Sequence, residues 1–113
     1  MGASIYKAST TGAAAISTTA TVPAGQFYKL AHISLNLDVA PVANENYTIT
    51  LDAAAGAAYD VLLYSLDLSA GSTTDLFWYP EAETFLGPGD AVVVAYVNTN
   101  TRTYGSQITM VAT

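Results

Sequence analysis

One turn and the strand that follows it constrain the fold more than any other part of the sequence. The turn spans residues 86–90 (LGPGD), in which Pro88 and Gly89 supply the fixed and the permissive backbone angles of a tight turn. Residues 91–97 (AVVVAYV) carry no charge, which is typical of a strand buried on both faces. Such a strand belongs in the middle of a two-layer β-structure.

Strand patterns separated by turn residues recur along the rest of the chain. Every second position is mostly apolar in the runs 15–22, 31–37, 47–51 and 104–110, with Thr18 and Ser106 as polar members of these rows, as in strands with one buried face. Leu30 breaks this alternation, which indicates a β-bulge or a change of neighbouring strand. The segment 59–66 is apolar on both faces and is predicted to form a second central strand, whereas 53–58 (AAAGAA) is too short for a stable helix and is predicted to be a loop or single turn.

About eight short strands, without a long helix or an internal repeat, predict an all-β, single-domain β-sandwich. We expect a jelly-roll-like arrangement of antiparallel strands. Residues 1–12 are assigned to an N-terminal arm or edge strand, and residues 13–113 to the sandwich domain. The predicted core contains Ile33, Leu35, Tyr59, Val61, Leu63, Val92, Val94 and Tyr96.

The composition indicates that part of the surface contacts other protein subunits. Only 11% of residues are charged, against roughly 25% in an ordinary soluble domain. The chain has 8 Tyr but only 3 Lys plus Arg, and subunit interfaces are enriched in aromatic residues and depleted in Lys and Glu. We therefore expect a symmetric homo-oligomer, with a trimer favoured by analogy to jelly rolls that cluster around a threefold axis.

Charge and cysteine content exclude several function classes. The net charge is −6 and the cations Lys7, Lys29 and Arg102 are scattered along the chain, so we expect no nucleic-acid binding. The chain has no cysteine, which excludes disulfides, zinc–thiolate sites and thiol chemistry. We expect no secretory signal and no membrane span, since no apolar run approaches the required length.

No catalytic or metal-binding motif stands out. His32, Ser34 and Asp38 share a strand face, but neighbours on a strand lack the geometry of a hydrolytic triad, and no Gly-x-Ser-x-Gly elbow is present. The acidic residues Glu81, Glu83 and Asp90 could converge near one edge, but the chain has no Asp-x-Asp-x-Asp-Gly calcium loop. We expect a protein that is not an enzyme and that holds no cofactor or metal.

The aromatic run Phe77-Trp78-Tyr79 offers a different possibility, a platform on which a sugar ring could stack. Successive residues of a strand point to opposite sides. Trp78 is therefore predicted to face away from Phe77 and Tyr79, with at least one side in the core. Carbohydrate binding stays open as an alternative.

Several segments of the chain resemble small proteins encoded among the virion genes of tailed bacteriophages. The resemblance runs from about residue 17 to 108 and is carried by the segments 22–25 (VPAG), 46–52 (NYTITLD), 57–65 (AAYDVLLYS), 89–90 (GD), 95–99 (AYVNT) and 102–105 (RTYG). It implies a virion structural protein, made in the host cytoplasm, with no catalytic residues to carry over. A capsid decoration (cement) protein that binds and stabilises the head, through the major capsid protein or another virion protein, is the first expectation. A tail- or fibre-associated protein and a glycan-binding module are the alternatives. The turn at 86–90 is also similar to trimeric jelly rolls of the tumour-necrosis-factor and complement-head type.

Three residues are predicted to contact a partner. Ile5 and Tyr6 lie in a segment with little apolar periodicity, yet they are too apolar for a purely solvated tail. We expect an arm that becomes ordered against a neighbour or a capsid shell by adding to a sheet edge, the alternative being a frayed terminus without a role. Trp78 is the third predicted contact.

Overall fold

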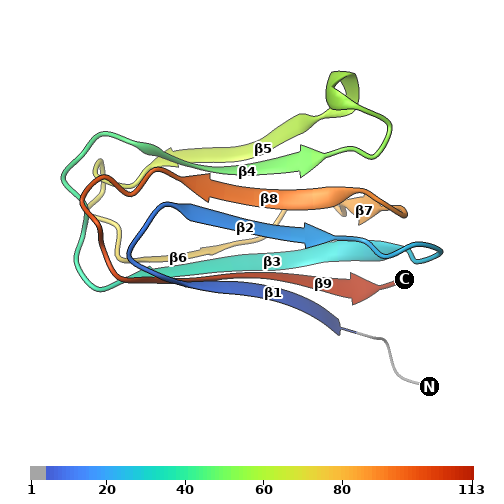
Figure 1. Cartoon of the computed structure of the whole chain (residues 1–113), viewed down its shortest axis with the longest axis horizontal. Helices are drawn as coiled ribbons and strands as arrows, with labels where there is room; N and C mark the ends of the chain where they lie inside the picture. Colours follow the sequence, from blue (N-terminus) through green and yellow to red (C-terminus); the bar gives the residue numbers. More distant parts are fainter. Residues whose placement is uncertain (1–4) are drawn as a thin grey trace.

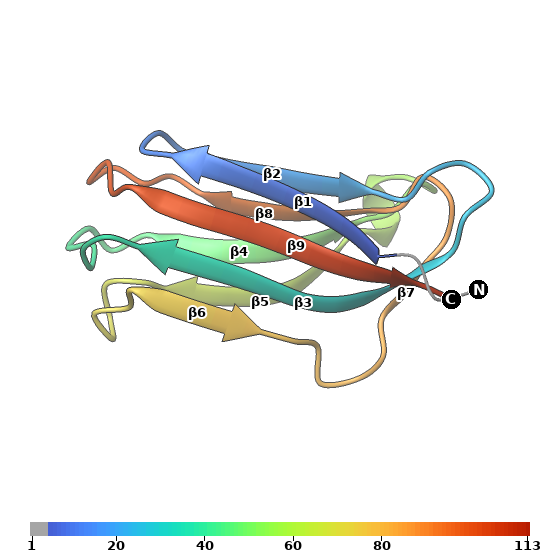
Figure 2. The ribbon, with the colours of Figure 1, turned by 90° about the horizontal axis from the view of Figure 1, so that it is seen from below.

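The computed structural model describes residues 5–113 and shows a sandwich of two antiparallel sheets (Figure 1). The elements are β1 (Ile5–Gly12), β2 (Ile16–Thr21), β3 (Tyr28–Leu37), β4 (Asn46–Asp52), the short 3-10 helix η1 (Ala57–Tyr59), β5 (Val61–Asp67), β6 (Asp75–Trp78), β7 (Phe85–Leu86), β8 (Ala91–Tyr96) and β9 (Tyr104–Ala112). One sheet has the strand order β1-β9-β3-β6, with β7 also paired to β3, and the other has the order β2-β8-β4-β5. Figure 2 shows the first sheet in front of the second.

The strand order follows from a nested set of antiparallel pairs. β1 pairs with β9, β2 with β8, β3 with β6, and β4 with β5, so the chain forms a long hairpin of strands. Pairing of β3 with β9 and of β4 with β8 rolls this hairpin into two sheets. Apart from the short β7, this is the strand order of a jelly roll. The structure confirms the predicted all-β, single-domain β-sandwich.

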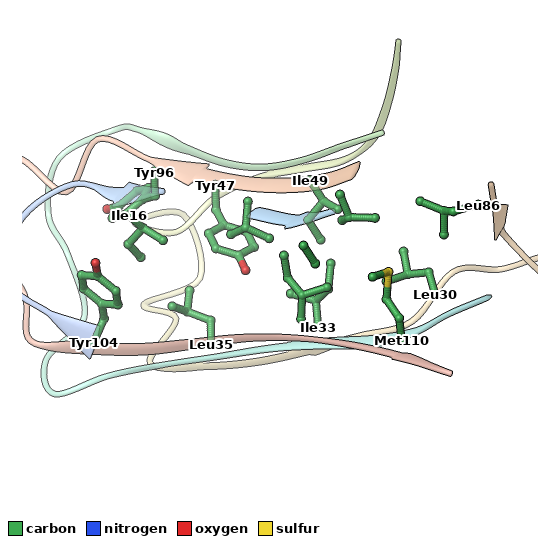
Figure 3. Packing of buried hydrophobic residues seen from close by; sticks show 14 of the residues in the cluster. Ile16, Leu30, Ile33, Leu35, Tyr47, Ile49, Leu86, Tyr96, Tyr104 and Met110 are labelled. Carbon is green, nitrogen blue, oxygen red and sulfur yellow. The ribbon is translucent and has the colours of Figure 1, made fainter. Parts of the chain in front are cut away.

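The core lies between the sheets and is filled by every second side chain (Figure 3). Ile33 of β3 and Ile108 of β9 meet Ile49 of β4 and Val94 of β8, and all four are completely buried. The predicted alternation of 15–22, 47–51 and 104–110 is confirmed, except that Thr109 is buried as well as its inward neighbours Ile108 and Met110. A polar contact crosses the same interior, because the Thr18 hydroxyl lies 3.3 Å from the Ser106 hydroxyl.

Two of the predicted core residues are exposed. Tyr59 is 66% exposed and Val61 is 48% exposed, while Leu63 is only partly buried. The predicted second central strand over 59–66 is wrong, because β5 is the outermost strand of its sheet and η1 precedes it. β8 does lie centrally, between β2 and β4, and its inward side chains are buried, but on its outer side Val93 and Ala95 are only half-buried.

The predicted bulge in β3 is confirmed. The register between β3 and β9 shifts between Leu30 and His32, so that Ala31 has no partner residue on β9. Leu30 is therefore buried together with Ile33, and Ala31 does not join the inward row that the sequence pattern predicted for it. The bulge brings an outward-facing His32 next to Thr109.

The interior position of Tyr47 makes the stability of the fold depend on pH. Its side chain is completely buried, and its hydroxyl has no hydrogen bond of good geometry among residues 5–113. Burial raises the pKa of Tyr47 far above its ordinary value of 10.0, and the Ser106 hydroxyl offsets a small part of that increase. As the pH rises above 10, the Tyr47 hydroxyl of the unfolded chain loses its proton, whereas that of the folded protein keeps it.

We predict that Tyr47→Phe flattens the alkaline loss of stability. Below pH 10 both states hold the proton, so the free energy of unfolding should change by no more than about 1 kcal/mol. Above pH 10 the unfolded wild-type chain binds fewer protons, so its free energy of unfolding falls with pH, and the variant should lose less. Urea unfolding between pH 7 and pH 11 measures this, and Tyr59→Phe, at an exposed position, should keep the wild-type dependence.

Candidate docking surface

The connection between β4 and β5 projects from one end of the sandwich (Figure 1). We call residues 53–62 the apical loop; it contains η1 and the first two residues of β5. It is built almost entirely from small or apolar residues, with Asp60 as its single charge. Every residue of the apical loop except Ala53 is exposed, including Tyr59, Val61 and Leu62. Exposed apolar groups that lie together mark surfaces that contact other molecules.

Two carboxylates hold the base of the apical loop. Asp60 Oδ1 accepts a hydrogen bond from the Ala53 amide at 2.9 Å. Asp90 accepts two more, from the Ala54 amide at Oδ1 and from the Gly87 amide at Oδ2, each at 2.9 Å. Hydrogen bonds to an ionised acceptor are stronger than those between neutral groups. The loop is therefore presented in a defined orientation.

The turn predicted at 86–90 is the second support of the apical loop. Gly89 has a φ of 83°, a left-handed conformation that favours glycine. A Cβ atom at Gly89 would lie 3.0 Å from the Ala54 Cβ, so the turn and the loop approach each other closely. The turn thus both starts β8 and supports the apical loop.

The three residues predicted to contact a partner occupy different environments. Ile5 is exposed, Tyr6 is half-buried with its ring edge-on to Tyr28 at 6.0 Å, and Trp78 is half-buried with its ring 5.6 Å from that of Tyr64. β1 pairs with β9 from Ile5 to Gly12. Residues 5–12 therefore form an edge strand of the sandwich, and residues 1–4 of the predicted arm lie outside the described residues.

The residues of the sketched catalytic triad make other contacts. His32 stacks on Phe77, with 4.7 Å between the ring centroids. Asp38 Oδ1 accepts hydrogen bonds from the amides of Val39 and Thr103 and so closes a loop. Within residues 5–113, no three His, Asp or Glu side chains converge in a metal-binding arrangement. The described part of the chain also has no helix of the length and apolarity needed to cross a membrane.

The aromatic run of β6 divides as predicted. Trp78 faces the interior, while Phe77 and Tyr79 are exposed and meet edge-to-face at 5.3 Å. Phe77 thereby contacts both His32 and Tyr79 on the outer side of the sheet.

Comparison of the chain with protein-family models, with curated proteins and with solved structures finds no match.

Sequence reasoning located the apical loop but assigned its largest residues wrongly. Residues 53–58 were expected to be a loop or single turn, and η1 with its preceding turn confirms this. Because the segment 59–66 is apolar on both faces, the sequence pattern predicts a central strand there, with Tyr59 and Val61 in the core. The available signal was the run of alanines around Gly56, whose side chains are too small to form a buried layer over Tyr59.

We predict that Asp90→Ala frees the base of the apical loop without unfolding the sandwich. The amides of Ala54 and Gly87 lose their acceptor, which should cost about 1–3 kcal/mol of unfolding free energy. Hydrogen exchange followed by NMR should show faster exchange at these two amides. Asp52→Ala removes a nearby exposed carboxylate that holds neither amide, and it should leave their exchange rates unchanged; equal acceleration in both variants would contradict the assignment.

Proposed function

We propose that this chain is a structural protein of a bacteriophage virion, most simply a capsid decoration protein that binds the head surface through the apical loop. The observation that carries the proposal is the exposure of Tyr59, Val61 and Leu62 on a loop whose base is fixed by Asp60 and Asp90. In this proposal the protein works by binding, without catalysis, and its partner is the major capsid protein.

The physical argument is the cost of leaving these side chains in water. Burial of apolar surface is favourable by roughly 25 cal/mol per Å², and the apical loop presents its apolar groups on a support that is already ordered. Binding therefore orders little additional backbone, which lowers the entropic cost of association. The same contact repeated on a head surface also places neighbouring copies at high effective concentration.

A tail- or fibre-associated protein is the alternative within the same class, and it would use the same loop. The resemblance to phage virion proteins implies the decoration role first and the tail- or fibre-associated role second. A homo-oligomer, with the trimer as the favoured form, remains a prediction that rests on the low charge and the number of tyrosines.

We predict that Leu62→Asp weakens binding to heads while leaving the fold intact. Leu62 is 60% exposed, so the new carboxylate costs little in the free protein but must be desolvated on binding. Val97→Asp is the matched control, because Val97 is 64% exposed and follows the opposite end of β8. Co-sedimentation with heads of the phage that encodes the chain should show at least about tenfold weaker binding for Leu62→Asp only, a difference of about 1.4 kcal/mol.

Two results would contradict the proposal. Full binding by Leu62→Asp would show that the apical loop is not the contact. Sedimentation of the wild-type chain with tails but not with heads would contradict the decoration role and favour the tail-associated alternative.

A further inference from the structure

A second surface, unrelated to the apical loop, covers the outward side of the sheet β1-β9-β3-β6. We call it the outer face; Figure 2 views the molecule from this side. Strand pairing arranges its side chains in rows that cross the sheet. One row contains Thr11, Gly105, Asn36 and Asp75. The next row contains Ser9, Gln107, Ser34 and Phe77.

The middle of the outer face is polar but uncharged. Ser9, Thr11, Ser34, Asn36 and Gln107 line a shallow hollow of about 240 Å³. This is just below the range of roughly 300–1,000 Å³ for small-molecule pockets. Within residues 5–113 the side chains of Ser34 and Asn36 form no hydrogen bond to the protein, so their donors and acceptors are available to a ligand.

Gly105 keeps this hollow open. It lies in β9 between Thr11 of β1 and Asn36 of β3. A Cβ atom at Gly105 would lie only 2.7 Å from Asn36 Oδ1, so any larger residue would have to displace the Asn36 amide. The absence of a side chain at this position leaves room for a ligand beside Asn36.

Aromatic rings border the polar hollow on one side. Phe77 is the cross-strand partner of Ser34, and it contacts His32 and Tyr79. Phe77 and Tyr79 remain about 60% exposed within this cluster (59% and 62%). The hydroxyl and amide groups of the hollow therefore lie next to the exposed rings of Phe77 and Tyr79.

We propose that the outer face binds a neutral oligosaccharide. A sugar residue has the two properties that this surface matches: hydroxyl groups that pair with Ser34, Asn36 and Gln107, and an apolar C–H face that packs against Phe77 and Tyr79. The row that contains Gln107 carries no charge, and the two flanking rows carry one charge of each sign, Asp75 and Lys7, so the surface has no excess of positive charge to attract an anionic ligand. In a binding module with this chemistry, the polar groups set the orientation and the ring supplies apolar contact.

The experiment uses the full chain on an array that carries neutral glycans together with sialylated and sulfated ones. The wild-type protein should bind neutral glycans. Titration calorimetry with the neutral oligosaccharide that gives the highest signal should then show at least about tenfold weaker binding for Phe77→Ala. Phe27→Ala is the matched control, since Phe27 is 60% exposed and precedes β3, away from the hollow; its affinity should equal that of the wild type.

A second variant tests the polar part of the surface. Gly105→Ala should weaken binding by displacing the Asn36 amide, while circular dichroism and the melting temperature show that the sandwich is still folded. The proposal is overturned if no neutral glycan binds, if only sialylated or sulfated glycans bind, or if Phe77→Ala and Phe27→Ala have the same affinity. Because the apical loop belongs to the connections of the other sheet, none of these results would affect binding to heads through Leu62.

Discussion

The burial of one side chain at every second position, between two sheets that face each other, is the interaction on which the whole structure depends. Ile33 and Ile108 from one sheet and Ile49 and Val94 from the other have no exposed surface. Complete burial of such a side chain stabilises the fold by about 1.5–3 kcal/mol. The nested strand pairs, from the outermost pair β1–β9 to the innermost pair β4–β5, bring these inward rows together.

Because only the inward side chains of each strand form the core, the outward positions have no role in it. They carry few charges, and two groups of them differ clearly in chemistry. The apical loop exposes aliphatic and aromatic groups on a support fixed by Asp90. The outer face exposes hydroxyls and amides beside Phe77 and Tyr79. The two proposals assign contact with another protein to the apical loop and contact with a neutral, hydroxyl-rich ligand to the outer face.

The sequence predicted those features that depend on local periodicity. The alternation of Ile16, Thr18 and Ala20, the irregularity at Leu30 and the opposite orientations of Trp78 and Phe77 all follow from the two-residue repeat of a strand. The strand order also matches the expected jelly roll. The position of 59–66 could not be predicted in this way, because a run with apolar residues on both faces is compatible with a central strand and with an exposed edge strand.

Long-range pairing decides between those two readings. β4 pairs with β8 on one side and with β5 on the other, so β5 is the outermost strand of its sheet. The residues that precede β5 therefore project beyond the sheet. Neither the support of the apical loop by Asp90 nor the hollow around Gly105 is visible in sequence, since each joins residues from distant strands. The candidate sites therefore emerged from the structure, although the residues of β6 had already indicated a surface for sugars.

The most direct test of the central claim is hydrogen exchange of the chain, free and bound to phage heads. Exchange at backbone amides reports which segments become protected in the complex. The proposed docking predicts slower exchange in residues 53–62 and unchanged exchange in residues 97–103, at the opposite end of β8. Protection confined to β1, or to residues 97–103, with no change in the apical loop would contradict it.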